Sequence, residues 1–130
     1  MAPLMVSFEL PRSAEACYRA FCDVSLMKLW VPDLKLVRVV RKDERERPVE
    51  VYFESGGRHS YALVYAFDDT HLKLRWVPSA GVRDGVSGRA SFQPLAHGCH
   101  FTYALDGLRA GLQEHETEVA TAFAQWIIDG

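Results

Sequence analysis

The sequence has no long apolar run and no clear excess of charge of either sign. Its uncharged apolar stretches fall far short of the ~20 residues that cross a bilayer, so we expect no stable membrane insertion. The formal net charge is −2, from 15 Lys and Arg against 17 Asp and Glu. A nucleic-acid-binding domain usually carries a clearly basic face, which this balance does not indicate. We therefore expect no nucleic acid partner.

The chain is also poor in cysteine and lacks the pattern of a secretion signal. Cys17, Cys22 and Cys99 are odd in number and share no spacing typical of a metal site. They are typical of free thiols in a reducing compartment. Residues 1–5 lead into a strand pattern, without a basic region followed by an apolar one. We therefore expect a cytoplasmic protein.

No repeat, low-complexity segment or linker divides the 130 residues. A chain of this length buries roughly two thirds of its unfolded surface in one core. The composition, 48% hydrophobic and 25% charged, is that of an ordinary globular protein. The sequence therefore predicts one domain over residues 1–130.

Alternation of apolar and polar residues predicts seven strands. They are expected over residues 4–10, 34–40, 50–54, 61–67, 72–77, 86–93 and 99–106. The last three in particular have one apolar and one polar face, which is typical of an antiparallel sheet with one wet side. The mixed charges of residues 41–48 cancel, so this segment predicts a solvated hairpin loop in preference to a binding tail.

Helical patterns occur only between the first two strands and at the end of the chain. Ser13 is a good N-cap for a helix that ends near Asp23. A second short helix is expected over residues 25–30, because the residue before Pro32 is pushed out of the helical region. A long amphipathic helix is expected over residues 108–128, with an apolar stripe that includes Leu112, Val119, Phe123, Trp126, Ala120 and Ile127.

This order, β-α-α-β6-α, resembles the helix-grip fold of the SRPBCC superfamily, which includes START lipid-transfer domains, birch-pollen-allergen-like proteins and polyketide cyclase/dehydrases. Residues 11–23 resemble the end of its opening strand and its first helix. Residues 29–34 resemble its tryptophan-proline turn, residues 67–76 its usual hairpin, and residues 91–103 the pattern before its last strand. The resemblance implies an α+β fold, with a curved antiparallel sheet wrapped around the long C-terminal helix.

A space between such a sheet and helix commonly holds a ligand, and the predicted inward faces here are apolar and aromatic. The predicted lining residues are Trp30, Phe53, Tyr61, Tyr65, Trp76, Phe92, Phe101, Tyr103 and Phe123. The tyrosines and tryptophans among them combine an apolar body with one hydrogen-bonding tip. Gly88 and Ala90 are expected to leave room for the helix or a ligand. Taken singly, each residue is more typical of core packing than of ligand contact.

Signals for catalysis or metal binding are weak. The most suggestive cluster is residues 97–100, but strand geometry places Cys99 and His100 on opposite faces, and no second pair has zinc spacing. His115 has glutamate neighbours, yet adjacent residues of a helix diverge by about 100° around its axis. We therefore predict no catalytic residue, no metal ion and no cofactor.

Three hypotheses for function follow. The favoured one is a carrier or sensor that binds a lipid, a quinone or a polyketide-like molecule in an internal cavity without catalysis. The second is a polyketide cyclase/dehydrase-like enzyme that uses the same cavity. The third is a protein-partner module resembling the heat-shock-ATPase activators, and a homodimer is left open in each case.

Overall fold

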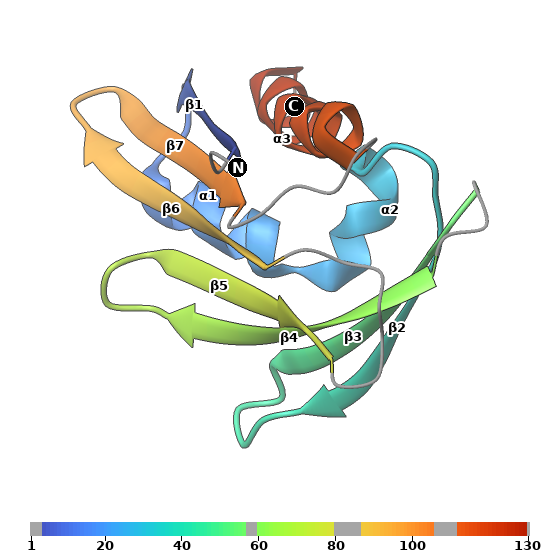
Figure 1. The fold of residues 1–130 in the computed structure, drawn as a ribbon. Helices are drawn as coiled ribbons and strands as arrows, with labels where there is room; N and C mark the ends of the chain where they lie inside the picture. The colour runs from blue at the N-terminus through green and yellow to red at the C-terminus, as the bar shows by residue number, and fades with distance from the viewer. Residues whose placement is uncertain (1–3, 57–59, 80–86, 106–111, 130) are drawn as a thin grey trace.

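A computed structural model describes residues 4–56, 60–79, 87–105 and 112–129, with the side chains of α3 described from residue 118 onward. Eleven elements follow one another along these residues (Figure 1). They are β1 (Leu4–Leu10), α1 (Ala14–Cys22), η1 (Val24–Leu26), α2 (Met27–Trp30), β2 (Leu34–Lys42), β3 (Pro48–Ser55), β4 (Ser60–Asp68), β5 (Lys73–Pro78), β6 (Gly88–Leu95), β7 (Gly98–Leu105) and α3 (Leu112–Asp129).

The seven strands form one curved antiparallel sheet in the order β1-β7-β6-β5-β4-β3-β2. Strands β2 to β7 therefore lie side by side in sequence order, and β1 returns to pair with the last strand, β7. Strands β1 and β2 are the two edges of the sheet, which does not close into a barrel. The predicted α+β helix-grip architecture is confirmed.

The helices cover the concave face of this sheet. Helix α1 packs on β6 and β7, α2 packs on β2, and α3 packs on β1 and on α2. Side-chain packing through α3 and α2 therefore connects the two edge strands, which no backbone ladder joins (Figure 1). None of the described helices combines the length and apolarity needed to cross a membrane.

Local chemistry explains where the first helices begin and end. The Ser13 side chain accepts a hydrogen bond from the Ala16 backbone N–H at 3.1 Å, as an N-cap does. Helix α1 ends before Asp23, whose carboxylate then accepts from the Ser25 backbone N–H at 3.0 Å and caps η1. The second helix expected over residues 25–30 is divided into the single 3₁₀ turn of η1 and the single α turn of α2.

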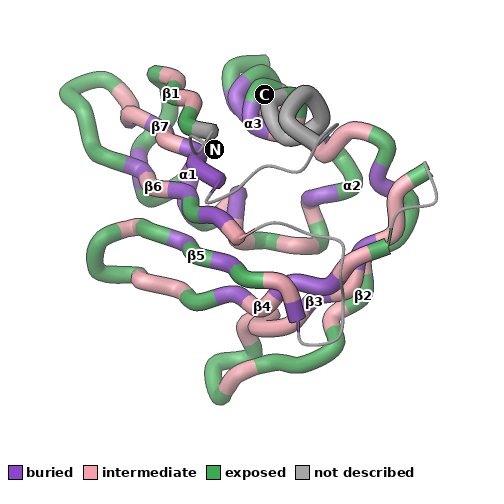
Figure 2. The backbone as a smooth tube through the Cα atoms, viewed as in Figure 1, coloured by how far each residue is buried: buried purple, intermediate pink, exposed green. Residues whose placement is uncertain are grey.

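Burial alternates along the strands as predicted (Figure 2). In β5, Leu74 and Trp76 are buried while Lys73 and Arg75 are exposed. The buried stripe of α3 consists of Ala120, Phe123, Ala124 and Ile127, all at most 4% exposed. Val119 and Trp126, which were also expected in that stripe, are half-buried at its margin, so the helix is rotated slightly from the expected orientation.

The segment of mixed charge, residues 41–48, is only in part the solvated loop that its sequence predicted. Strand β2 extends to Lys42, and most of the side chains that follow it are exposed. Asp43 and Arg47 are half-buried instead, because they bind each other and the neighbouring turn. Val86 and residues 108–111, assigned from the sequence to a strand and to the last helix, lie outside the described residues.

Candidate functional site

Phe123 of α3 lies at the centre of an aromatic cluster between the sheet and the helices. Its ring centroid is 5.0 Å from that of Phe21 on α1, 5.0 Å from that of Trp30 on α2 and 5.2 Å from that of Phe101 on β7. Phe123 and Phe101 are both fully buried. The last helix therefore faces the interior of the sheet, as predicted.

Eight of the nine residues predicted to line the interior are buried, and the ninth, Tyr61, is half-buried. Phe92 and Phe101 stack at 5.0 Å, and Trp76 lies 5.5 Å from Tyr103. Among the predicted residues, the rings of Tyr65 and Trp76 also lie in contact at 6.3 Å, and those of Phe53 and Tyr61 at 5.1 Å. The structure thus brings these side chains to one face of the sheet, and their contact with a ligand stays a prediction.

Sequence reasoning missed Phe21 as a member of this cluster. The ring of Phe21 contacts the rings of Trp30, Trp76, Phe92, Phe101, Tyr103 and Phe123. The sequence does carry a pattern that indicates this position, because Ala14, Cys17, Tyr18 and Phe21 have the spacing of one helix face. In the structure all four are buried. Helix α1 therefore contributes a ring to the interior, as α3 does.

The space beside Gly88 is occupied by the cluster itself. A Cβ atom at Gly88 would lie 2.7 Å from the Trp76 ring and 2.7 Å from the backbone oxygen of Ala104. Gly88 is paired directly with Trp76 across the ladder. The absent side chain therefore makes room for the indole of Trp76, where the sequence had suggested room for the helix or a ligand.

Trp30 carries an unusual polar atom into this interior. Its side chain is 6% exposed, and its indole Nε1 is buried without a hydrogen-bond partner. Buried Tyr18 differs, because its hydroxyl donates to Asp69 Oδ1 at 2.8 Å. Burial is the largest cause that raises the pKa of Tyr18, and the bond to Asp69 is the next, so the hydroxyl stays a neutral donor.

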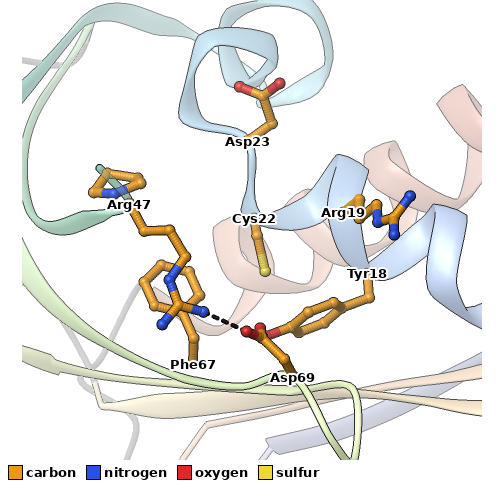
Figure 3. Close-up of a pocket in the computed structure, with 8 residues that line it drawn as sticks. Tyr18, Arg19, Cys22, Asp23, Arg47, Phe67 and Asp69 are labelled. Atoms are coloured by element: carbon orange, nitrogen blue, oxygen red, sulfur yellow. Dashed lines mark hydrogen bonds and ion pairs between the residues drawn. The ribbon is translucent and has the colours of Figure 1, made fainter. Parts of the chain in front are cut away.

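A separate pocket of about 190 Å³ lies where α1 meets the β2–β3 and β4–β5 turns (Figure 3). Arg47 Nη1 donates to Asp69 Oδ2 at 2.6 Å, on the other side of that carboxylate from Tyr18. The Arg47 guanidinium also lies 4.8 Å from the centre of the Phe67 ring and binds Asp43 at 3.0 Å. These groups are engaged with one another, so the arrangement fixes two turns against α1.

The three cysteine thiols are poor nucleophiles. Burial, with a further contribution from Cys99, raises the pKa of the Cys17 thiol from 9.0 to about 12. Burial likewise raises the pKa of Cys22 to about 12 and raises that of Cys99. A thiolate attacks and a thiol does not, so the environment of each cysteine opposes covalent catalysis.

The histidines give no constellation for catalysis in the described part of the chain. Cys99 is buried while His100 is half-buried and His97 exposed, which agrees with the opposite faces expected from strand geometry. His71 is exposed and binds Asp68 at 2.9 Å. The side chain of His115 lies outside the description. Among the described residues no three His, Cys, Asp or Glu side chains are grouped to hold a metal ion.

The sequence matches no protein-family model, and a search of curated proteins found no match. Solved structures are similar in fold. A START superfamily protein from Mycobacterium smegmatis has a TM-score of 0.78 at 13% identity, with 96% of each chain covered. The Zhui aromatase/cyclase from Streptomyces has a TM-score of 0.66 at 11% identity, with 96% of this chain and 85% of that one covered.

The di-domain ARO/CYC protein BexL has a TM-score of 0.73 at 12% identity, and the match covers 96% of this chain and 46% of BexL. At these identities the likeness shows the fold alone. The chain therefore has the helix-grip fold that these START and aromatase/cyclase structures share, and the fold implied by the resemblance is confirmed.

Proposed function

We propose that this chain binds a hydrophobic or aromatic small molecule between the concave face of its sheet and α3, as a carrier or sensor. The observation that carries the proposal is the aromatic cluster around Phe123, to which α1, α2, α3, β6 and β7 each contribute a ring. Flat apolar faces of this kind suit a lipid, a quinone or a polyketide-like molecule. The fold shared with START and aromatase/cyclase proteins supports the same proposal.

Binding is favoured over catalysis because of the state of four titratable groups, Tyr18, Cys17, Cys22 and Cys99. An enzyme in this interior would need a group poised to give or take a proton near neutral pH. Burial instead raises the pKa of Tyr18 and of all three thiols, which keeps them protonated. The same free thiols support the proposal of a cytoplasmic protein.

The decisive experiment has two stages. Native mass spectrometry of protein purified from its host should reveal a co-purifying small molecule. Equilibrium dialysis against menadione, oleic acid and 9-fluorenone should then show saturable binding of at least one of them. No co-purifying molecule, together with dissociation constants above ~1 mM for all three probes, would exclude the proposal.

Two variants of β6 provide a matched comparison. Phe92 is 2% exposed and stacks on Phe101, whereas Leu95 is 45% exposed. We expect Phe92→Leu to weaken binding of the best probe at least about threefold, because a stacked ring is lost. Leu95→Ala should leave binding unchanged. Product formation, seen as a mass change of the probe, would favour the polyketide cyclase/dehydrase-like alternative.

A further inference from the structure

Trp30 is placed in the interior by the end of α2. It is the last residue of that helix, and Val31 follows in an extended conformation before Pro32. The indole packs edge to face on Phe123 at 5.0 Å and 69°, and at a tilt on Phe21 at 5.5 Å. A phenylalanine could supply these ring contacts as well, so packing alone does not account for an indole here.

The distinguishing property of an indole is its N–H, which donates and does not accept. In the described part of the chain, Nε1 of Trp30 is the one buried side-chain nitrogen or oxygen without a hydrogen-bond partner. Other buried polar groups are satisfied, as Tyr18 is by Asp69 and Ser79 is by Glu50 at 2.9 Å. Such groups in native proteins are nearly always paired, so this donor requires an explanation.

Among the residues that the structure describes, the neighbours of Trp30 do not supply a strong acceptor. Phe21 and Phe123 are hydrocarbon rings with no oxygen or nitrogen, and an N–H bond to a ring face is weaker than one to a carbonyl oxygen. A ligand that places an oxygen against Nε1 would satisfy the donor. That oxygen would be neutral, because an apolar interior disfavours an ionised carboxylate.

We infer that the Trp30 N–H is the polar anchor of the interior site, and that the ligand is a planar aromatic ketone or quinone whose carbonyl oxygen accepts from it. This inference rests on the proposed function. The aromatic cluster holds the rings of the ligand, and Trp30 sets their orientation. Hydrocarbons of the same shape therefore bind more weakly than ketones.

The test uses two probes that differ in one group, 9-fluorenone with a carbonyl and fluorene with a methylene in its place. We expect the wild-type protein to bind fluorenone about tenfold more tightly than fluorene in equilibrium dialysis, the ratio that one hydrogen bond supplies. Trp30→Phe keeps a ring and removes the donor, so its ratio should fall to about one. Trp126→Phe is the matched control, because Trp126 is half-buried on α3, 6.1 Å from Phe123.

A second measurement does not depend on the variants folding. In a ¹H–¹⁵N spectrum of the wild-type protein, the Trp30 indole signal should shift downfield with fluorenone and move little with fluorene. Two results would overturn the inference and leave the proposed function standing. One is equal affinity for the two probes with an unmoved Trp30 signal. The other is a preference for fluorenone over fluorene that is lost in Trp126→Phe and kept in Trp30→Phe. If the wild-type protein bound neither of these probes and none of the probes of the previous section, and no small molecule co-purified with it, both the inference and the proposed function would be overturned.

Discussion

Replacing Phe123 by alanine is the most direct test of how α3 holds the sheet. The side chain is fully buried, and its ring lies within 5.0 to 6.2 Å of the rings of Phe21, Trp30, Phe101, Trp126 and Phe92. These partners come from three helices and two strands. The substitution therefore removes contacts from every layer of the molecule at once.

The expected magnitude follows from that burial. A Phe-to-Ala change in a packed core lowers the free energy of unfolding by about 3–5 kcal/mol, from lost transfer free energy and the cavity left behind. Since Phe123 has five aromatic neighbours, we expect a value in the upper half of that range. A typical domain is stable by about 5–15 kcal/mol, so Phe123→Ala could lose a third or more of the total. Phe123→Leu, which keeps much of the volume, should cost about 1–2 kcal/mol.

Urea unfolding followed by circular dichroism measures these differences, provided that the slope with denaturant stays constant. Ile128→Ala on the same helix is the control, because Ile128 is 52% exposed. It should change the free energy of unfolding by no more than about 0.5 kcal/mol. If Phe123→Ala cost less than about 1 kcal/mol, or no more than Ile128→Ala, α3 would not be packed into the concave face and the reasoning would be refuted.

Three further predictions concern other parts of the fold. Gly98 has φ of 150°, and a Cβ there would collide with the Leu10 carbonyl oxygen. Gly98→Ala should therefore lower the free energy of unfolding, measured in urea, by at least about 2 kcal/mol. A smaller loss would contradict the register of β1 on β7. Burial raises the pKa of Cys17 from 9.0 to about 12, so the unfolded chain releases this proton first, and stability falls as pH rises above 9.0. Cys17→Ala should make this decline shallower by about 1 kcal/mol per pH unit, and identical slopes would argue against a buried thiol. Tyr18→Phe removes the bond to Asp69 and should cost about 1 kcal/mol in thermal or urea unfolding, whereas no change would show that the bond is not formed in solution.

The sequence predicted the strands well because each alternates over a face that is buried on one side only. A shift of one residue would expose Leu74 and Trp76 and bury Arg75, so the register follows from the pattern. Helix α1 was predictable for a similar reason, since Ser13 has the side chain that caps a helix and a local spacing identifies the buried face. Local physics thus determined most of the architecture.

Contacts between distant segments could not be predicted in this way. Arg47 binds Asp69, which is 22 residues away, and Tyr18 binds the same carboxylate across 51 residues. Each looked like an ordinary residue of a turn or a helix. The unpaired N–H of Trp30 was equally hidden, because an unsatisfied donor is defined by every atom around it. The candidate aromatic residues were accessible to sequence reasoning, and the unpaired donor on which the proposed ligand selectivity rests was not.

The joint between β1 and β2 has a mechanical consequence. From β1 to β2, hydrogen-bonded ladders connect each strand to the next, and the packing of α3 on β1, of α2 on β2 and of the two helices on each other completes the loop. A barrel closed by backbone bonds has a fixed circumference, whereas packed helices slide past one another by small steps at little cost. We therefore expect the molecule to widen at these two helices when it admits the proposed ligand, while the hydrogen-bonded ladders of the sheet stay intact.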